Sequence, residues 1–275
     1  MSPWRSVHAS VMGTAHVTTG QPCQDHHAVK SILNGQDEPL LLLVTSDGAG
    51  SAAHSEEGSR EVCAETLRWL EICLSDGGDF LDKDAGVRLV HNLRHHLLNY
   101  AEEAERNYGL RDLACTLNVA ALLPGRGWFV QVGDGATVIE RDGGPLEIVF
   151  WPDNGEYANQ TYFVSDVPDG HIHTRVIAGC IDRVALMTDG LQAIALSLQQ
   201  RAPHAPFFTP MFRALEALDA PDTEQHGQLQ AGLIRFLDSP AVNARTSDDK
   251  TLVLSSRRPA PEATPVEPAE EVEAV

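Results

Sequence analysis

Residues 40–50 read LLLLVTSDGAG, an apolar run that ends on the pair Asp47-Gly48. Five consecutive apolar residues predict a strand buried inside a sheet, and Asp-Gly predicts a sharp turn where the strand ends. Downstream, apolar residues recur at three- and four-residue steps from Cys63 to Leu74, the pattern of a helix that packs one face on a sheet. The region therefore indicates a buried strand, an acidic turn and a covering helix.

Apolar strands that end on Asp-Gly occur twice more in the chain. Residues 128–135 read WFVQVGDG and end on Asp134-Gly135, and residues 184–190 read VALMTDG and end on Asp189-Gly190. Three other Asp-Gly pairs lie in polar loops, where a simple turn explains them. Asp47, Asp134 and Asp189 instead lie at strand ends, and this position marks them as candidate functional residues.

Two further acidic sites lie where apolar strands begin. Asp25 precedes the segment 26–29, and Asp248-Asp249 precede 251–254. If these strand ends share one edge of the molecule, each like-charged pair of carboxylates costs about 4 kcal/mol at about 4 Å and a dielectric constant of about 20. Divalent cations relieve such repulsion. Hard oxygen ligands without a histidine or cysteine set favour magnesium or manganese over zinc, so the sequence predicts a paired site for one of these ions.

The predicted elements follow the order strands, helices, strands, helices and a final strand. We predict strands at 5–16, 26–33, 40–45, 116–123, 128–132, 136–140, 146–150, 183–187 and 251–255. Helices are predicted at 63–74, 90–108 and through most of 191–237, and 151–179 is interpreted as a polar stretch. Glycine-rich turns between the strands of 116–150 indicate antiparallel neighbours. This order favours an α+β fold with two mainly antiparallel sheets and helices packed outside.

Composition and charge exclude several classes of protein. The 275 residues carry a formal charge of −19, which opposes binding to nucleic acid or to anionic lipid. The start of the chain lacks the apolar core of a secretory signal, and the densest apolar run is far shorter than the roughly 20 residues of a membrane span. Five scattered cysteines include no C-x-x-C pair. We expect a cytoplasmic protein with reduced thiols and no membrane or nucleic-acid partner.

The composition changes at residue 257. From there to residue 275 the chain is rich in Pro, Ala, Glu and Val without periodicity, and it contains five glutamates. Such a segment lacks enough apolar surface to fold alone. We predict one globular domain over residues 1–256 and a disordered acidic tail over 257–275.

The acidic motifs occur together in a known order. Residues 24–29 (QDHHAV), 46–52 (SDGAGSA), 115–117 (CTL), 131–136 (QVGDGA), 186–190 (LMTDG) and 247–254 (SDDKTLVL) follow each other with characteristic spacing. In this the chain resembles the metal-dependent type 2C (PPM-type) protein serine/threonine phosphatases, and in its DGAGS form a divergent bacterial branch of them. The resemblance implies a four-layer α-β-β-α sandwich with two metal ions at one end.

The resemblance also implies roles for the acidic residues. Asp47 would bridge both ions, and the Gly48 carbonyl would join one of them. Asp189 and Asp248 would complete the ligands of the first ion, while Asp25 would support the second through water. Asp134 resembles the residue that helps to hold a weak third ion. For Asp249 two interpretations stay open: it shapes the ligand set, or it is exposed.

The function implied is hydrolysis of phosphoserine and phosphothreonine esters in a phosphoprotein substrate. A water or hydroxide that bridges two Mn²⁺ or Mg²⁺ ions would attack phosphorus, because paired cations lower the pKa of water and clamp the phosphoryl oxygens. A serine/threonine kinase partner would supply the substrate.

Three positions depart from the family pattern. Gly20 stands where better-known members have a phosphate-binding arginine, Gln24 replaces a glutamate, and Ala49 replaces a histidine that protonates the leaving group. These changes raise the alternative of a catalytically silent phosphatase fold that serves as a binding or regulatory module. The intact aspartates favour an active enzyme.

Histidines near the motifs offer substitutes for the missing proton donor. His16 and His54 flank motif segments, and we choose His54 as the catalytic partner of Asp47. The other pairs, His26-His27, His95-His96 and His171/His173, lack a third ligand at suitable spacing and are expected to be surface features.

A dinucleotide-binding fold is a competing interpretation. Gly48-x-Gly50-x-x-Ala53 follows an apolar strand and precedes a helix, as that fold requires. However, Glu56 and Glu57 would place negative charge where a pyrophosphate binds, and an antiparallel segment follows instead of a βαβ unit.

Overall fold

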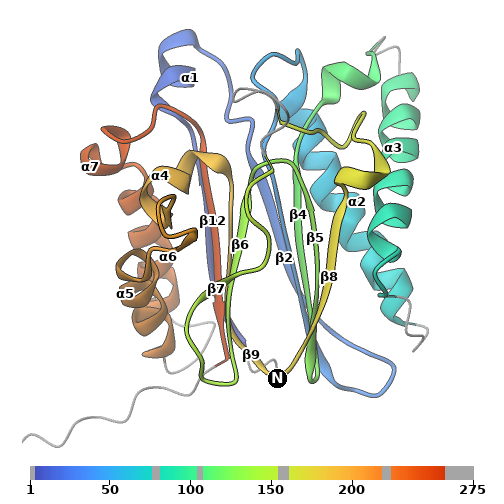
Figure 1. Cartoon of the computed structure of the whole chain (residues 1–275). Helices are drawn as coiled ribbons and strands as arrows, with labels where there is room; N and C mark the ends of the chain where they lie inside the picture. Colours follow the sequence, from blue (N-terminus) through green and yellow to red (C-terminus); the bar gives the residue numbers. More distant parts are fainter. Residues whose placement is uncertain (1–3, 76–80, 104–107, 154–160, 219–223, 258–275) are drawn as a thin grey trace, which may run out of the picture.

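The computed structural model describes residues 4–75, 81–103, 108–153, 161–218 and 224–257. Two five-stranded sheets pack face to face, and helices cover the outer face of each sheet (Figure 1). This is the predicted four-layer α-β-β-α sandwich. All strand pairs within the two sheets are antiparallel, which excludes the dinucleotide-binding interpretation because that fold is built on a parallel sheet.

The first sheet has the strand order β2-β3-β4-β5-β8. Its strands are β2 (His26–Leu33), β3 (Pro39–Ser46), β4 (Leu117–Leu123), β5 (Arg126–Val132) and β8 (His173–Ala178). The long helices α2 (Ser55–Ser75) and α3 (Ala85–Glu102) cover its outer face, on the right in Figure 1. The 3-10 turns η2 (Leu110–Leu113) and η3 (Asp169–His171) lead into β4 and β8.

The second sheet has the order β1-β12-β9-β6-β7. Its strands are β1 (Arg5–Val11), β12 (Lys250–Ser256), β9 (Ile181–Met187), β6 (Ala136–Arg141) and β7 (Glu147–Ile148). Helices α5 (Ala205–Glu216) and α6 (Glu224–Leu237) cover it. The short elements are α1 (Thr14–Thr19), η4 (Asp189–Leu191), α4 (Gln192–Ala195), the hairpin β10 (Leu196–Ser197) with β11 (Ala202–Pro203), and α7 (Pro240–Asn243).

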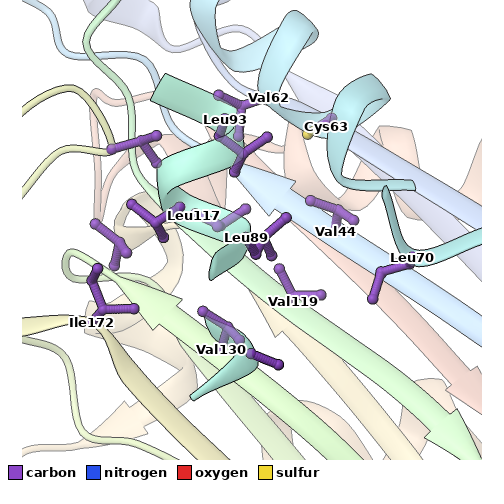
Figure 2. Close-up of a cluster of buried hydrophobic side chains, with 14 of the residues drawn as sticks. Val44, Val62, Cys63, Leu70, Leu89, Leu93, Leu117, Val119, Val130 and Ile172 are labelled. Carbon is purple, nitrogen blue, oxygen red and sulfur yellow. The ribbon is translucent and has the colours of Figure 1, made fainter. Parts of the chain in front are cut away.

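Burial on both faces explains the apolar run in β3. Leu40, Leu42 and Val44 join the core between the first sheet and its helices, part of which Figure 2 shows. Leu41 and Leu43 point the other way, into the core between the two sheets. A strand covered on both faces reads as a continuous apolar run and not as an alternation. The run therefore fixes β3 at the centre of the sandwich.

Several predicted boundaries were wrong. The helices predicted at 63–74 and 90–108 begin earlier, at Ser55 and Ala85, and the second ends at Glu102. The first strand ends at Val11 instead of residue 16, and Thr14–Thr19 forms α1 although it contains β-branched residues. A side chain on Gly13 would overlap the backbone of Ser247 and Asp248, so packing against that loop turns the chain here. Strand β8 lies within the stretch interpreted as polar. It is an edge strand whose side chains are all partly or largely exposed and only half of which are apolar, so no apolar pattern revealed it.

Histidines join the edge strands of the two sheets. His8 Nδ1 on β1 lies 2.8 Å from His27 Nε2 on β2, and His27 Nδ1 lies 2.8 Å from Ser10 Oγ. Burial, with the charges of His8 and His26 as smaller causes, lowers the pKa of His27 to about 3. The expectation that His27 is a surface feature was therefore wrong, because its ring is part of the contact between the sheets.

Other expectations concern the tail, the cysteines and the membrane. The predicted tail lies outside the described residues except for Arg257. All five cysteines are free thiols. Within the described ranges, none of the helices combines the length and the apolar character needed to cross a bilayer.

Candidate functional site

The strand ends that carry the predicted aspartates meet at one end of the sandwich, near α1 and α4 in Figure 1. In the first sheet, the pairing of His26 with Ser46 places Asp25 beside Asp47. In the second sheet, Ala136 and Leu252 both pair with Met187, which brings the segments of Asp134, Asp189 and Asp248 together. Antiparallel pairing thus converts three strand ends and two strand starts into one cluster.

The carboxylates of this cluster are close to one another. Oxygen atoms of Asp47, Asp134 and Asp189 all lie within 4.8 Å of each other. The charges of Asp25 and Asp248 also act on Asp47, so that both belong to the same electrostatic cluster. The structure therefore brings together all five aspartates that the sequence singled out as metal ligands.

Burial and mutual repulsion favour the protonated forms when no cation is bound. Burial, opposed by hydrogen bonds and reinforced by neighbouring carboxylates, raises the pKa of Asp25 to about 8. Burial and the charges of Asp134 and Asp248 raise the pKa of Asp189 to about 7. The pKa of Asp47 is raised well above its usual value, first by burial and then by the surrounding aspartates. Such a cluster is costly unless positive charge enters it.

Several oxygens of the cluster have no hydrogen-bond donor. Among the described residues, the buried atoms without a partner include Asp25 Oδ1, Asp134 Oδ1, Asp189 Oδ1 and the amide oxygen of Gln24. Unpaired buried acceptors are rare in folded proteins because each one loses its bond to water. These atoms are hard oxygen donors, which suit Mg²⁺ or Mn²⁺. The residues present therefore fit a divalent-cation site.

Neighbouring threonines fix the strand ends. Thr188 Oγ1 donates a hydrogen bond of 2.7 Å to Asp25 Oδ2 and accepts one of 3.0 Å from the Thr251 backbone. The Asp47 N–H donates to Thr116 Oγ1 at 3.0 Å, and the Thr116 N–H donates to the Asp47 carbonyl at 2.8 Å. One threonine therefore joins the two sheets across the cluster, and the other holds the turn that carries Asp47.

Glycines after two of the aspartates permit close backbone packing. A Cβ on Gly48 would lie 2.8 Å from the Gln24 carbonyl oxygen and from atoms of Ser55. A Cβ on Gly190 would overlap the carbonyl oxygen of Asp249. The absence of a side chain is therefore required at both positions to bring the ligand segments together.

We expect Gly190→Ala to damage the cluster. The new methyl group would press on the Asp249 backbone and separate Asp189 from Asp248, so the free energy of unfolding should fall by about 1–3 kcal/mol. The rise in melting temperature on adding Mn²⁺ should also shrink. Gly170→Ala is the matched control, because nothing lies within 4 Å of a Cβ on Gly170. Equal Mn²⁺-induced shifts in the two variants would contradict the expectation.

Asp249 is buried, so the exposed alternative was wrong. Its side chain is 2% exposed. Oδ1 accepts the Gly13 N–H at 2.6 Å, and Oδ2 accepts the Gln24 N–H at 2.6 Å and lies 3.0 Å from His16 Nδ1. This carboxylate ties the segments before β2 and β12 to α1.

His54, the predicted proton donor, lies at the start of α2. Its Nδ1 is 3.5 Å from Glu57 Oε1, and its ring stacks on Tyr108 with centroids 3.6 Å apart. His54, Glu56 and Glu57 form a separate group of ligand-type atoms within 4.8 Å of one another. The structure therefore pairs His54 with side chains of the helical layer, and its catalytic role stays a prediction.

The sequence analysis missed a cluster beside the aspartates. Asp153 Oδ2 lies 2.7 Å from His173 Nε2 and 3.2 Å from His171 Nδ1, and Tyr162 Oη lies 3.1 Å from the other nitrogen of His171. Burial raises the pKa of Asp134, and the charges of Asp248 and, to a smaller extent, Asp153 raise it further. His171 and His173 therefore have a common partner, 20 or fewer residues away in sequence but at no motif spacing that would reveal it.

A sandwich of two antiparallel sheets with a buried carboxylate cluster at the strand ends is the arrangement of a protein that binds divalent cations. A family model described as protein phosphatase 2C matches residues 12–238. The chain belongs to this family, as the motif resemblance predicted. It is 36% identical over 253 residues to serine/threonine-protein phosphatase 3 of Escherichia coli (strain K12), in a match that covers 92% of this chain and 98% of that protein. The protein is a metal-dependent protein serine/threonine phosphatase that acts on phosphoproteins.

Solved structures share the fold. The match to a bacterial serine phosphatase covers 92% of this chain and 98% of that one, with a TM-score of 0.55 and 14% identity. The catalytic domain of the serine/threonine phosphatase PstP, in complex with two manganese ions, matches over 92% and 97%, with a TM-score of 0.55 and 21% identity. RsbX in complex with magnesium matches over 92% and 94%, with a TM-score of 0.54 and 11% identity.

Proposed function

We propose that the five clustered aspartates hold the divalent cations on which the phosphatase reaction depends. In this assignment Asp47, the Gly48 carbonyl, Asp189 and Asp248 would hold the first ion, and Asp47 would also serve the second. Asp25 would support the second ion through water, and Asp134 would contribute to a weak third. The observation that carries the proposal is the convergence of buried, unpaired carboxylate oxygens from both sheets.

The side chains of this protein perform the positioning. When bound, Mn²⁺ or Mg²⁺ supplies an activated water and neutralises charge on the phosphoryl oxygens. Thr188 fixes the orientation of Asp25, and Thr116 fixes the turn of Asp47. Gly48 lets the turn pack against the Gln24 carbonyl, which holds Asp47 close to the segment of Asp25. The manganese of PstP and the magnesium of RsbX support either ion for this chain.

The cluster also argues against the silent binding module that the three departures from the family pattern raised. In a silent module without bound cations, the mutual repulsion of the aspartates would destabilise the fold and serve no catalytic purpose. The five aspartates nevertheless form one electrostatic cluster, and burial with their neighbours' charges raises the pKa values of Asp25, Asp47 and Asp189. Repulsion of this kind is expected at a site that binds cations.

The wider setting is also a proposal. A serine/threonine kinase must form the phosphoester that this protein cleaves, so we propose a kinase partner in the same pathway. A cytoplasmic location fits five free thiols. We propose that residues 1–256 are one catalytic domain and that 257–275 form an acidic tail.

The test is release of phosphate from p-nitrophenyl phosphate and from a phosphothreonine peptide in the presence of Mn²⁺. We expect turnover on both substrates, abolished by EDTA and restored by excess Mn²⁺. Turnover that persists in EDTA would refute the metal-dependent mechanism. Tight Mn²⁺ binding by calorimetry without turnover on any phosphopeptide would establish the silent module instead.

A further inference from the structure

Asp249 connects the candidate metal centre to a histidine that the proposed ligand set does not use. Two backbone N–H groups, from Gly13 and Gln24, donate to its carboxylate at 2.6 Å each. These bonds fix the orientation of the carboxylate. Asp248 precedes Asp249 in sequence, and the bond from Gln24 brings the segment of Asp25 next to it. Asp249 therefore lies directly beside the aspartate cluster.

His16 completes this arrangement from α1. Its Nδ1 lies 3.0 Å from Asp249 Oδ2, and its side chain is 12% exposed. Because an ionised carboxylate only accepts hydrogen bonds, Nδ1 carries the proton in this pair. His16 is thus held beside Asp249 through Nδ1, and Nε2 is the ring nitrogen that this contact leaves available.

The reaction needs such a group. A serine or threonine oxygen leaves as a strongly basic alkoxide unless it receives a proton, and a positioned acid contributes about 10²–10⁴-fold to such steps. Ala49, at the family's acid position, has no proton to give. His54 contacts Glu57 and Tyr108 in the helical layer, whereas His16 is bonded to the residue next to Asp248.

We propose that His16, oriented by Asp249, protonates the oxygen of the departing serine or threonine. As water attacks phosphorus and the P–O ester bond breaks, the electron pair of that bond stays on the substrate oxygen. This oxygen takes the proton from His16 Nε2, and the neutral imidazole regains a proton from solvent. The inference rests on the proposed function and names a residue that replaces the family's missing acid.

Leaving groups of different basicity test the role of His16. In His16→Asn, the amide nitrogen keeps a donor for Asp249 but the Nε2 proton is lost. We expect kcat on the phosphothreonine peptide to fall by about 10²-fold, and kcat on p-nitrophenyl phosphate to change by less than about threefold, because p-nitrophenolate leaves without a proton. His91→Gln, an exposed histidine on α3, is the matched control and should leave both rates unchanged.

Further readouts separate this role from a structural one. The Mn²⁺-induced rise in melting temperature should be equal in wild type and His16→Asn, which shows that the fold and the cation site persist. His16→Gln is a second variant with the same expectation, should His16→Asn fold poorly. Nitrogen-15 spectra of the wild type should show a protonated Nδ1 on His16 that disappears in His16→Asn.

Three outcomes would overturn the proposal. Equal losses on both substrates would assign His16 to phosphate binding or structure, and unchanged rates would remove it from the reaction. A selective loss on the peptide in His54→Gln but not in His16→Asn would make His54 the acid. Absence of EDTA-sensitive turnover in the wild type is a different failure, because it refutes the proposed function itself.

Discussion

Asp47→Asn is expected to lower Mn²⁺-dependent kcat/KM on a phosphothreonine peptide by about 10³-fold or more. The charges of the other four aspartates in the cluster all act on Asp47. Loss of its charge removes the ligand assigned to both ions, and cation stabilisation of a phosphoryl transition state is worth several kcal/mol, where about 4 kcal/mol corresponds to about 10³-fold. Steady-state rates with saturating Mn²⁺ measure the effect.

The same variant should keep its fold. Burial and repulsion penalise the charged form of Asp47, so asparagine relieves the cluster, and in EDTA the variant should be at least as stable as the wild type. Asp169→Asn is the matched control, because Asp169 also precedes a glycine but is exposed and pairs with His91. Near-wild-type turnover by Asp47→Asn would show that the cluster is not the catalytic centre.

Without divalent cations, the protein should lose stability as the pH rises from 6.5 to 8. Burial raises the pKa of Asp25 to about 8, far above its value in the unfolded chain. In this range the folded state therefore holds a proton that the unfolded state has released. The free energy of unfolding falls by about 1.4 kcal/mol per pH unit for such a group well below its pKa and by half as much at the pKa, which gives about 1.6 kcal/mol over the range.

The sign distinguishes this effect from ordinary carboxylate behaviour. An aspartate in an ion pair has a lowered pKa, so the free energy of unfolding rises with pH. Asp25, with a pKa of about 8, and Asp189, with a pKa of about 7, make the free energy of unfolding fall as the pH rises. Urea unfolding in EDTA at three pH values across this range measures the slope. Asp25→Asn should flatten it. A slope that is zero or positive in the wild type would contradict the expectation.

Manganese should remove or reverse this slope. Cations bind the deprotonated carboxylates, so binding releases protons and becomes tighter as the pH rises. The stabilisation by a fixed Mn²⁺ concentration should therefore be larger at the upper end of the pH range than at the lower end. This measurement tests the carboxylate cluster independently of catalysis.

Local sequence patterns predicted most residues of the candidate site. Each Asp-Gly pair after an apolar strand marked a position at a sheet end, because strands cannot continue through that turn. The run LLLLV identified a strand buried on both faces, which the cores on either side of β3 confirm. The family motifs then linked the separate aspartates, and the structure brings all five together.

Long-range contacts decided what the patterns missed. Strand β8 is recognised only by its pairing with β5, since its exposed side chains carry no apolar period. The sequence predicted that His27 is a surface residue, but in the structure it contacts His8 on β1 of the other sheet. The sequence around Asp249 did not indicate its three partners, because Gly13, His16 and Gln24 lie 225 or more residues away.

The sequence by itself determined which residue types stand at the strand ends, and therefore the chemistry of the site: hard oxygen donors without competing histidine or cysteine ligands. Only the tertiary structure decided which oxygens lack a donor, how far the pKa values rise and which histidine meets a carboxylate. The physical reason is range. Turn chemistry and strand burial depend on neighbouring residues, whereas burial of charge and hydrogen-bond pairing depend on the packing of two sheets whose strands come from distant parts of the chain.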